Sequence, residues 1–219
     1  MIKSGRIAYR DAAGRETGYE TFDLIAAQGR RLLRALCVMK DIGLIREVSI
    51  GMGDDFRPHD GQCRIWQGGA ESLMRFAIGP DQAVCGGHVL PLGAPLPYLG
   101  LHPLSGDALI IHQRGTDAPG EYRPIAAITN SISPNGEEDL HMQAMEIAVA
   151  YIGPGEIDVA AGRFAAWHYR LRWRNDWPPA DLWVRAGDGL FLMMRWAMVP
   201  AWYELTDWCD GPAPCPQSG

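Results

Sequence analysis

The sequence lacks the long apolar segments that mark membrane insertion or export. A membrane-spanning helix needs about 18 or more consecutive apolar residues, and no stretch of this chain reaches that length. The opening residues, MIKSGRIAYRD, also lack the apolar core of roughly 7–15 residues and the small-residue cleavage site of a secretory signal. We therefore expect a protein without a membrane span that is located in the cytoplasm.

Cysteine is scarce and the charge is not basic. An odd number of widely spaced cysteines is more typical of a reducing compartment than of a disulfide scaffold. The net charge of −6 argues against a nucleic-acid partner, which would require many lysines and arginines to neutralise phosphates. The five cysteines are Cys37, Cys63, Cys85, Cys209 and Cys215.

The sequence also lacks the short motifs of cofactor-dependent enzymes. It has no dinucleotide-binding glycine pattern, no phosphate-binding loop, no nucleophile elbow and no His-Glu-x-x-His. Cys85 and His88 have the spacing of two zinc ligands, but no second Cys/His pair at that spacing completes a site. We therefore predict neither a cofactor nor a metal.

Apolar residues in a strand-and-turn pattern make up most of the chain. Its 219 residues are 47% hydrophobic and 21% charged, which is typical of one globular domain. We predict a mainly β domain over residues 1–208, with few or short helices, and an irregular proline-rich tail over residues 209–219. Strands separated by glycine turns are expected over residues 20–28, 30–39, 44–50, 63–67, 72–78, 163–173, 181–185, 190–198 and 203–208.

Three segments are harder to assign. Four prolines and five glycines over residues 86–107 favour a long loop across the molecule, as in lids and binding loops. Residues 107–114 fit a strand or a helical turn. Residues 137–151 have a helical composition, but the alternation from Met145 to Tyr151 favours a strand in the second half.

The arrangement of strands resembles a group of bacterial antiparallel half-barrels. The resemblance rests on the segments Ala161–Leu171, Ala180–Val184 and Gly189–Leu192, and on an opening meander from Tyr19 to Val48. The group includes lipoprotein carriers and a pigment-pathway enzyme of the same shape. The resemblance implies a curved antiparallel sheet, a half-barrel or lipocalin-like open barrel, whose concave face holds an apolar guest. It does not imply one activity, because a fold hosts many functions.

His168 is the leading candidate for chemistry. It lies in the middle of a predicted strand, on the same face as Arg170. A neighbouring guanidinium would hold an imidazole neutral as a base and could stabilise an anion that forms during a reaction. The other interpretation is a solvated outer face, with Tyr169 pointing into the core.

Further candidates surround this histidine. Tyr151 and Tyr169 carry hydroxyl groups that could act as acids. Arg46 interrupts an apolar face, which is unusual unless the guanidinium meets a carboxylate or a ligand. Asp181 is a candidate partner for Arg46 or His168. Each of these residues could equally be structural.

The eight tryptophans form a large aromatic set that could line a pocket for a planar guest or fill the core. We predict that Trp66, Trp167 and Trp183, with Asp181, contact the guest. The other tryptophans are Trp173, Trp177, Trp196, Trp202 and Trp208. Two histidines near the proline-rich loop, His102 and His112, could enter the mouth of a cavity, but the pattern favours a position on the surface.

These patterns favour an enzyme that needs no cofactor. It would carry out elimination, hydration, isomerisation or cyclisation, as a lyase or isomerase, on a small hydrophobic aromatic or cyclic molecule. The alternative is a binding or carrier protein for such a molecule. A third, weaker alternative is an interaction protein with an exposed apolar patch. The sequence is also compatible with a homodimer.

Overall fold

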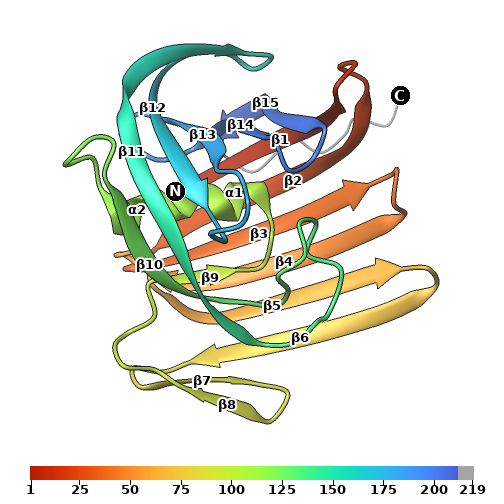
Figure 1. Cartoon of the computed structure of the whole chain (residues 1–219), viewed down its shortest axis with the longest axis vertical. Coiled ribbons are helices and arrows are strands. Elements are labelled where there is room, and N and C mark those ends of the chain that lie inside the picture. The colour runs from red at the N-terminus through yellow and green to blue at the C-terminus, as the bar shows by residue number, and fades with distance from the viewer. Residues whose placement is uncertain (212–219) are drawn as a thin grey trace.

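The chain forms one sheet of 15 strands that curves into an open barrel (Figure 1). The computed structural model describes residues 1–211. Neighbouring strands are antiparallel except β9 and β10, which are parallel. The predicted curved, unclosed antiparallel sheet with little helix is confirmed. The strands are β1 (Ile2–Asp11), β2 (Glu16–Ala27), β3 (Arg30–Met39), β4 (Leu44–Gly53), β5 (Pro58–Gln67), β6 (Ala70–Ile78), β7 (Gln82–Cys85), β8 (His88–Pro91), β9 (Tyr98–Gly100), β10 (Tyr122–Thr129), β11 (Gln143–Val159), β12 (Gly162–Arg172), β13 (Ala180–Arg185), β14 (Phe191–Trp196) and β15 (Ala201–Asp210).

Two meanders meet in the middle of the sheet. The first eight strands run outward from β1 to β8, and the others run outward from β15 to β9. The two ends of the chain meet where β1 pairs with β15. The sequence pattern predicts no strand at the positions of β1 and β10. Strand β10 is hard to predict because Pro124 lies within it, and a proline inside an apolar segment argues against a strand.

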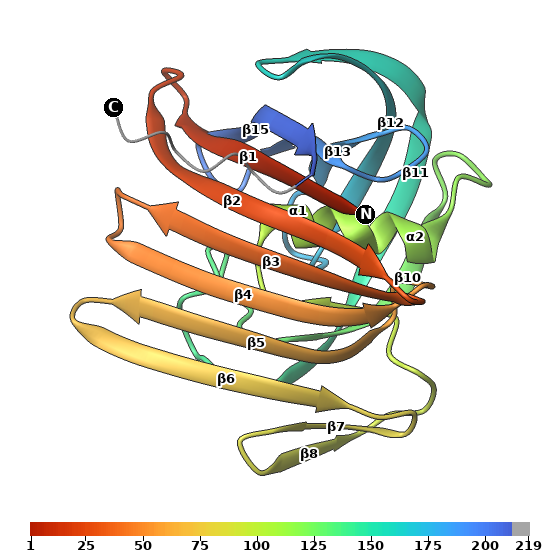
Figure 2. The same ribbon diagram turned by 180° about the vertical axis from the view of Figure 1, so that it is seen from behind.

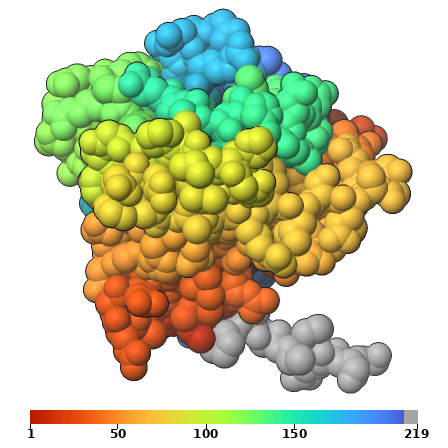
Figure 3. All heavy atoms as spheres, turned by 90° about the horizontal axis from the view of Figure 1, so that it is seen from below, coloured from red at the N-terminus to blue at the C-terminus, as the bar shows by residue number. Residues whose placement is uncertain are grey.

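The sheet does not close by hydrogen bonds among the described residues, and its free edges are β8 and β9. Strand β9 instead packs across β5, where the two ends of the sheet approach each other (Figures 1 and 2). Gly61 makes this approach feasible, because a Cβ there would lie 2.4 Å from Leu99 Cδ2. Seen from below, the yellow segment around β7 and β8 lies beside green segments from later in the chain (Figure 3).

Alternation within strands places the core on the concave side. In β4, Leu44, Arg46, Val48 and Ile50 are buried, whereas Glu47 between them is exposed. This is the face that the sequence pattern predicts for these residues. Arg46 therefore enters the interior among apolar neighbours and is only 2% exposed.

A short helical segment lies inside the curve of the sheet (Figure 2). It consists of α1 (Leu104–Asp107), the 3₁₀ turn η1 (Ala108–Ile110) and α2 (Ile111–Arg114). Charged side chains anchor both of its ends. Buried Glu20 accepts hydrogen bonds from the backbone N–H groups of Leu104 and Ser105 at 2.7 and 3.0 Å. Arg114 donates to four carbonyls at the other end, those of Asp117, Ala118, Glu121 and Val149.

The ambiguous segments now have definite structures. Residues 107–114 are helical, and the strand favoured from Met145 onward exists and extends over 143–159. The prediction of a plain loop over 86–107 is wrong, because short strands and the first helical turn form between the prolines. The predicted boundary at residue 208 is also wrong, because β15 continues to Asp210 and pairs with β1. The rest of the predicted tail, residues 212–219, lies outside the described residues.

Candidate functional site

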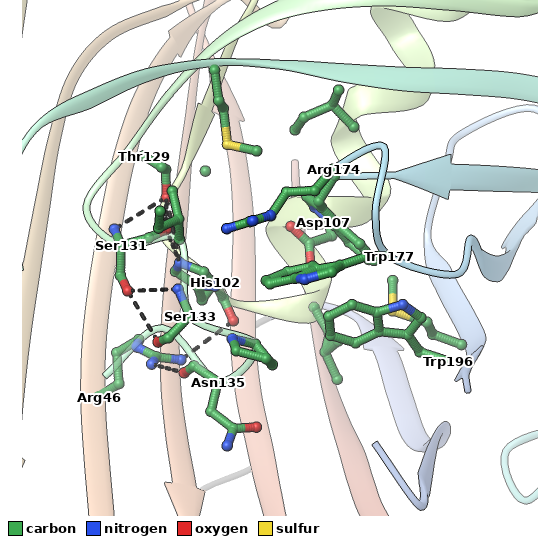
Figure 4. Close-up of a pocket in the computed structure, with 18 of the residues that line it drawn as sticks. Arg46, His102, Asp107, Thr129, Ser131, Ser133, Asn135, Arg174, Trp177 and Trp196 are labelled. Carbon is green, nitrogen blue, oxygen red and sulfur yellow. Dashed lines mark hydrogen bonds between the residues drawn. The ribbon is translucent and has the colours of Figure 1, made fainter. Parts of the chain in front are cut away.

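A pocket opens on the concave face beside the helical segment (Figure 4). Its residues come from both halves of the sheet, from α1 and from two loops, residues 130–142 and 173–179. The lining residues include Tyr9, Met39, Arg46, Tyr98, His102, Asp107, Thr129, Ser131, Ser133, Asn135, Met145, Ile147, Trp173, Arg174, Trp177, Met194, Trp196 and Tyr203.

One wall of the pocket is aromatic. The Trp196 ring lies 4.9 Å from that of Trp173 and 5.4 Å from that of Trp177, both tilted. The indole N–H of Trp196 donates to the carbonyl of Pro178 at 2.8 Å, which fixes its orientation. Three methionines complete an adaptable apolar surface, since their thioethers fit irregular shapes: Met39, Met145 and Met194.

A carboxyl group faces these rings. Asp107 lies at the end of α1, next to Trp177 in Figure 4, and is half-buried. The Tyr98 hydroxyl donates to its Oδ1 at 2.7 Å. Burial raises the pKa of Asp107 to about 7, and the hydrogen bond from Tyr98 only partly opposes that rise. This carboxyl can therefore gain or lose a proton near neutral pH.

Two further buried charges lie close to Asp107. Burial also raises the pKa of Glu20, although four donors hold its carboxylate: Leu104 N–H, Ser105 N–H, the Tyr9 hydroxyl at 3.2 Å and the Cys37 thiol at 3.6 Å. Arg46 is the nearby cation, and its charge lowers the pKa of Asp107. Its guanidinium donates to the carbonyls of Asn135, Gly136 and His102. Arg46 therefore holds the 130–142 loop against the sheet.

The opposite wall is polar but already hydrogen-bonded. His102 Nε2 lies 3.1 Å from the Ser131 carbonyl and 3.3 Å from the Thr129 hydroxyl. Burial and the charge of Arg46 lower the pKa of His102 to about 3, so its imidazole is neutral at physiological pH. The Ser133 hydroxyl is hydrogen-bonded to the Ser131 hydroxyl and to the Glu137 carboxylate. These groups shape the wall and keep the loop ordered.

A second cavity lies beside α2. The rings of Phe56 and His112 stack there at 3.6 Å, and burial lowers the pKa of His112 to about 4. Lys3 and Asp188, which form an ion pair, are among its lining residues. The lining also includes the cation of Arg31, and the buried Nε2 of His112 has no hydrogen-bond partner among the described residues.

The predicted catalytic residues do not converge. His168 and Arg170 lie on the convex face of β12, opposite Trp183 and Asp181 of β13 in the register of the sheet. His168 Nε2 is 2.8 Å from Asp181 Oδ1, and its ring stacks on Trp183 at 4.5 Å. The predicted contact between Asp181 and His168 exists, but the predicted grouping with the tyrosines in one cavity is wrong. Adjacent strand residues point to opposite faces.

The tyrosines and tryptophans that were predicted to face one cavity also lie in different places. Tyr169 and Tyr151 lie inside the barrel with ring centroids 5.2 Å apart, but neither lines the pocket. The Tyr169 hydroxyl donates to the carbonyl of Gly115, next to α2. Trp167 packs against the core without lining the pocket. Trp66 lies on the other face of β5 from buried Ile65, below the guanidinium of Arg64.

Among the predicted site residues, Arg46 alone lines the pocket. The sequence pattern did not indicate Asp107 or Tyr98, and it favoured a surface position for His102, which is wrong because His102 lines the pocket. A signal for Asp107 exists, because a carboxylate directly before the run Ala-Leu-Ile-Ile is unusual in a segment that becomes buried. No local signal indicates that Tyr98, nine residues earlier, contacts it.

Residues 1–211 contain no cluster of three or more His, Cys, Asp or Glu side chains arranged to hold a metal ion. None of the helices in this range is long and apolar enough to cross a bilayer. Cys85 and His88 face each other as a register pair in the β7–β8 hairpin.

Comparison with known proteins supports the fold alone. No family model and no curated protein matches the sequence. A β-barrel-like protein of DUF1849, a domain of unknown function, from Brucella abortus superimposes with a TM-score of 0.57 at 8% identity, covering 96% of this chain and 97% of its own. A DUF1089 family protein from Pseudomonas aeruginosa gives 0.53 at 16% identity, covering 81% and 89%. The chain thus has a β-barrel-like fold in the broad sense.

Proposed function

We propose that this protein binds a small amphipathic molecule in the concave pocket. The observation that supports this most directly is the division of the pocket into two kinds of wall. Tryptophans and methionines would cover an apolar body, and the hydroxyl and carboxyl groups around Asp107 would orient a polar group. Ligand pockets combine a mainly apolar lining with a few placed polar groups in this way.

Two further features favour a binding role. The resemblance to half-barrels whose concave face holds an apolar guest agrees with an interior site. Most polar groups of the opposite wall, such as Ser131 and Ser133, already have protein partners. Such groups add shape and polarity without adding a nucleophile.

A second candidate function is acid–base catalysis on the bound molecule, as a cofactor-independent lyase or isomerase. The observation that favours it is Asp107, a carboxyl that changes protonation near neutral pH beside the Tyr98 hydroxyl. Asp107 would take the role of base that the sequence analysis gave to His168, which lies on the convex face. A catalytic carboxyl of this kind works best when its pKa is near the working pH.

Titration of the protein with small ligands tests both candidates. The panel would contain aromatic, terpenoid and fatty compounds, and binding would be followed by tryptophan emission. Trp177→Ala should weaken binding about tenfold or more, because a buried aromatic contact is lost. Trp66→Ala, a change of the same size on the convex face, should leave affinity unchanged.

Chromatography of each incubation then separates the two functions. Recovery of every bound compound intact supports the binding protein. A new product that Asp107→Asn no longer forms supports the enzyme. If no compound binds saturably, or if Trp66→Ala weakens binding as much as Trp177→Ala, the pocket is not the site and both proposals fail.

A further inference from the structure

The buried charges around the pocket do not balance. Glu20 and Asp107 contribute two carboxyl groups, and Arg46 contributes one guanidinium. Arg174 also lines the pocket, but Asp176 holds its guanidinium with two hydrogen bonds of 2.9 Å each. When both carboxyls are ionised, the surroundings of the pocket carry one uncompensated negative charge. A buried charge without a partner is costly, so the site favours a proton or a cation.

Asp107 is where this charge is available. Glu20 has four donors, whereas Asp107 has one, the neutral hydroxyl of Tyr98. Among the described residues, no lysine, arginine or histidine donates to Asp107. Its Oδ1 is occupied by Tyr98, and the carboxyl faces the pocket. Oδ2 is therefore the acceptor that a ligand can reach.

The rings near Asp107 are suited to a cation. Trp173, Trp177 and Trp196 form one aromatic group, and the Tyr203 ring lines the pocket as well. The face of an aromatic ring attracts a cation electrostatically, most strongly for tryptophan. The ring of Trp177 already contacts one cation, because the guanidinium carbon of Arg174 lies 5.1 Å from its centre.

We propose that the pocket selects an organic monocation, an amine with a compact apolar body, whose ammonium group donates to Asp107 while the tryptophans cover the body. This inference rests on the proposed function, because it names the class of ligand for the same pocket. It goes further by predicting that charge at one atom, Asp107 Oδ2, determines the choice of ligand. One ammonium group would neutralise the pocket.

Binding of an amine should depend on pH in one direction. Only the ionised carboxylate accepts an ammonium donor, so amine affinity should fall as the pH is lowered through about 7, the pKa of Asp107. An alkylamine stays protonated throughout, with a pKa of about 10. The titratable or charged groups that face Asp107 are Glu20, Arg46, Tyr98 and Tyr203, and Tyr9, His102 and Arg174 also line the pocket.

The test compares amines with alcohols of the same shape. The pairs are 1-adamantylmethylamine with 1-adamantylmethanol, and octylamine with 1-octanol, each titrated calorimetrically at pH 5.5 and 8. At pH 8 the amine should bind at least tenfold more tightly than its alcohol, since a charge-assisted hydrogen bond is the stronger one. At pH 5.5 most of that preference should vanish, while the affinity of the alcohol stays unchanged.

Two variants locate the effect. Asp107→Asn keeps the shape and an acceptor for Tyr98, so the alcohol should bind as before and the preference for the amine should disappear. Asp181→Asn, the same change on the convex face, should keep the preference. Thermal unfolding of both variants checks that they fold.

The outcomes separate this inference from the proposed function. Equal binding of amine and alcohol by the unaltered protein would overturn the inference and leave the proposed function standing. A preference that survives Asp107→Asn would also overturn it. If neither member of either pair binds, the inference and the proposed function fail together.

Discussion

Two carboxylates, Asp107 inside the barrel and Asp181 on its convex face, show what distinguishes a candidate site from a structural ion cluster. Asp181 Oδ1 lies 2.8 Å from His168 Nε2 and 3.0 Å from Arg170 Nε, so its charge is balanced where it lies. Asp107 has a neutral hydroxyl as its one partner among the described residues. Asp181 has the residues that look catalytic around it, but their charges balance its own. Asp107 has fewer neighbours and lacks a cationic partner.

The largest expected effect comes from removing the interior cation. Arg46→Leu deprives three carbonyls of their donor and leaves Glu20 and Asp107 without a nearby positive charge. We expect a loss of about 3–5 kcal/mol in the free energy of unfolding, measured by urea denaturation. Arg170→Leu on the convex face should cost about 1 kcal/mol or less, as surface ion pairs do. Equal losses in the two variants would contradict the difference drawn between the two faces.

The second prediction concerns pH. The pKa of Asp107 is about 7 in the folded protein and about 3.9 in an unfolded chain. The folded state therefore binds this proton more tightly, and the free energy of unfolding falls as pH rises from about 4 to 7. Asp107→Asn removes this loss, so its stability relative to the unaltered protein should increase across that window.

Urea denaturation at four pH values between 4.5 and 7.5 checks this expectation. His102 and His112, whose pKa values are lowered, change stability in the opposite direction. Their contribution cancels when the variant is compared with the unaltered protein at each pH. Asp181→Asn serves as the matched control and should not show the pH-dependent gain. A constant difference for Asp107→Asn would show that this carboxyl titrates normally.

A smaller effect should follow from Tyr98→Phe. This change removes the hydrogen bond that lowers the pKa of Asp107, so that pKa should rise above about 7. The side-chain carboxyl ¹³C signal of Asp107, followed by NMR across the titration, measures it. We expect a cost in stability of about 1 kcal/mol for the lost hydrogen bond. Tyr122→Phe, in an outer strand, should leave the titration unchanged, and an unchanged curve for Tyr98→Phe would refute the proposed coupling.

The smallest effect is expected on the convex face. The double variant His168→Ala/Arg170→Ala should bind the compounds of the ligand panel with unchanged affinity, because neither side chain lines the pocket. Its stability should change by about 1 kcal/mol or less. Loss of binding or turnover in a folded double variant would restore the catalytic role that the sequence pattern suggested for His168.

Local pattern was sufficient to predict much of the sheet but not its inner face. The alternation over 163–173 correctly groups Tyr169 with Leu171 and His168 with Arg170. A period of two determines which residues share a face, but it does not determine which face is concave. The interruption of an apolar face by Arg46 was informative because a lone guanidinium among apolar residues needs partners wherever it lies.

The rest of the site depends on contacts between distant segments. Tyr98 reaches Asp107 because β9 pairs in parallel with β10 and α1 then turns into the barrel. Glu20 caps that helical segment from a position 84 residues earlier. Neither contact has a spacing signature, since side chains brought together by a crossover share no local period. The prolines that indicated a loop over 86–107 also concealed the short strand β9.

The contact between β9 and β5, here called the seam, determines how the width of this barrel can change. In the described chain no ladder hydrogen bond crosses it, and side chains make the contact instead. Leu99 of β9 lies over Gly61 of β5, and Arg46 of the neighbouring strand β4 donates hydrogen bonds to carbonyls of the 130–142 loop. A closed barrel can be widened only by adding strands or shifting its shear. Here a few substitutions along the seam could enlarge or narrow the interior while every strand keeps its register.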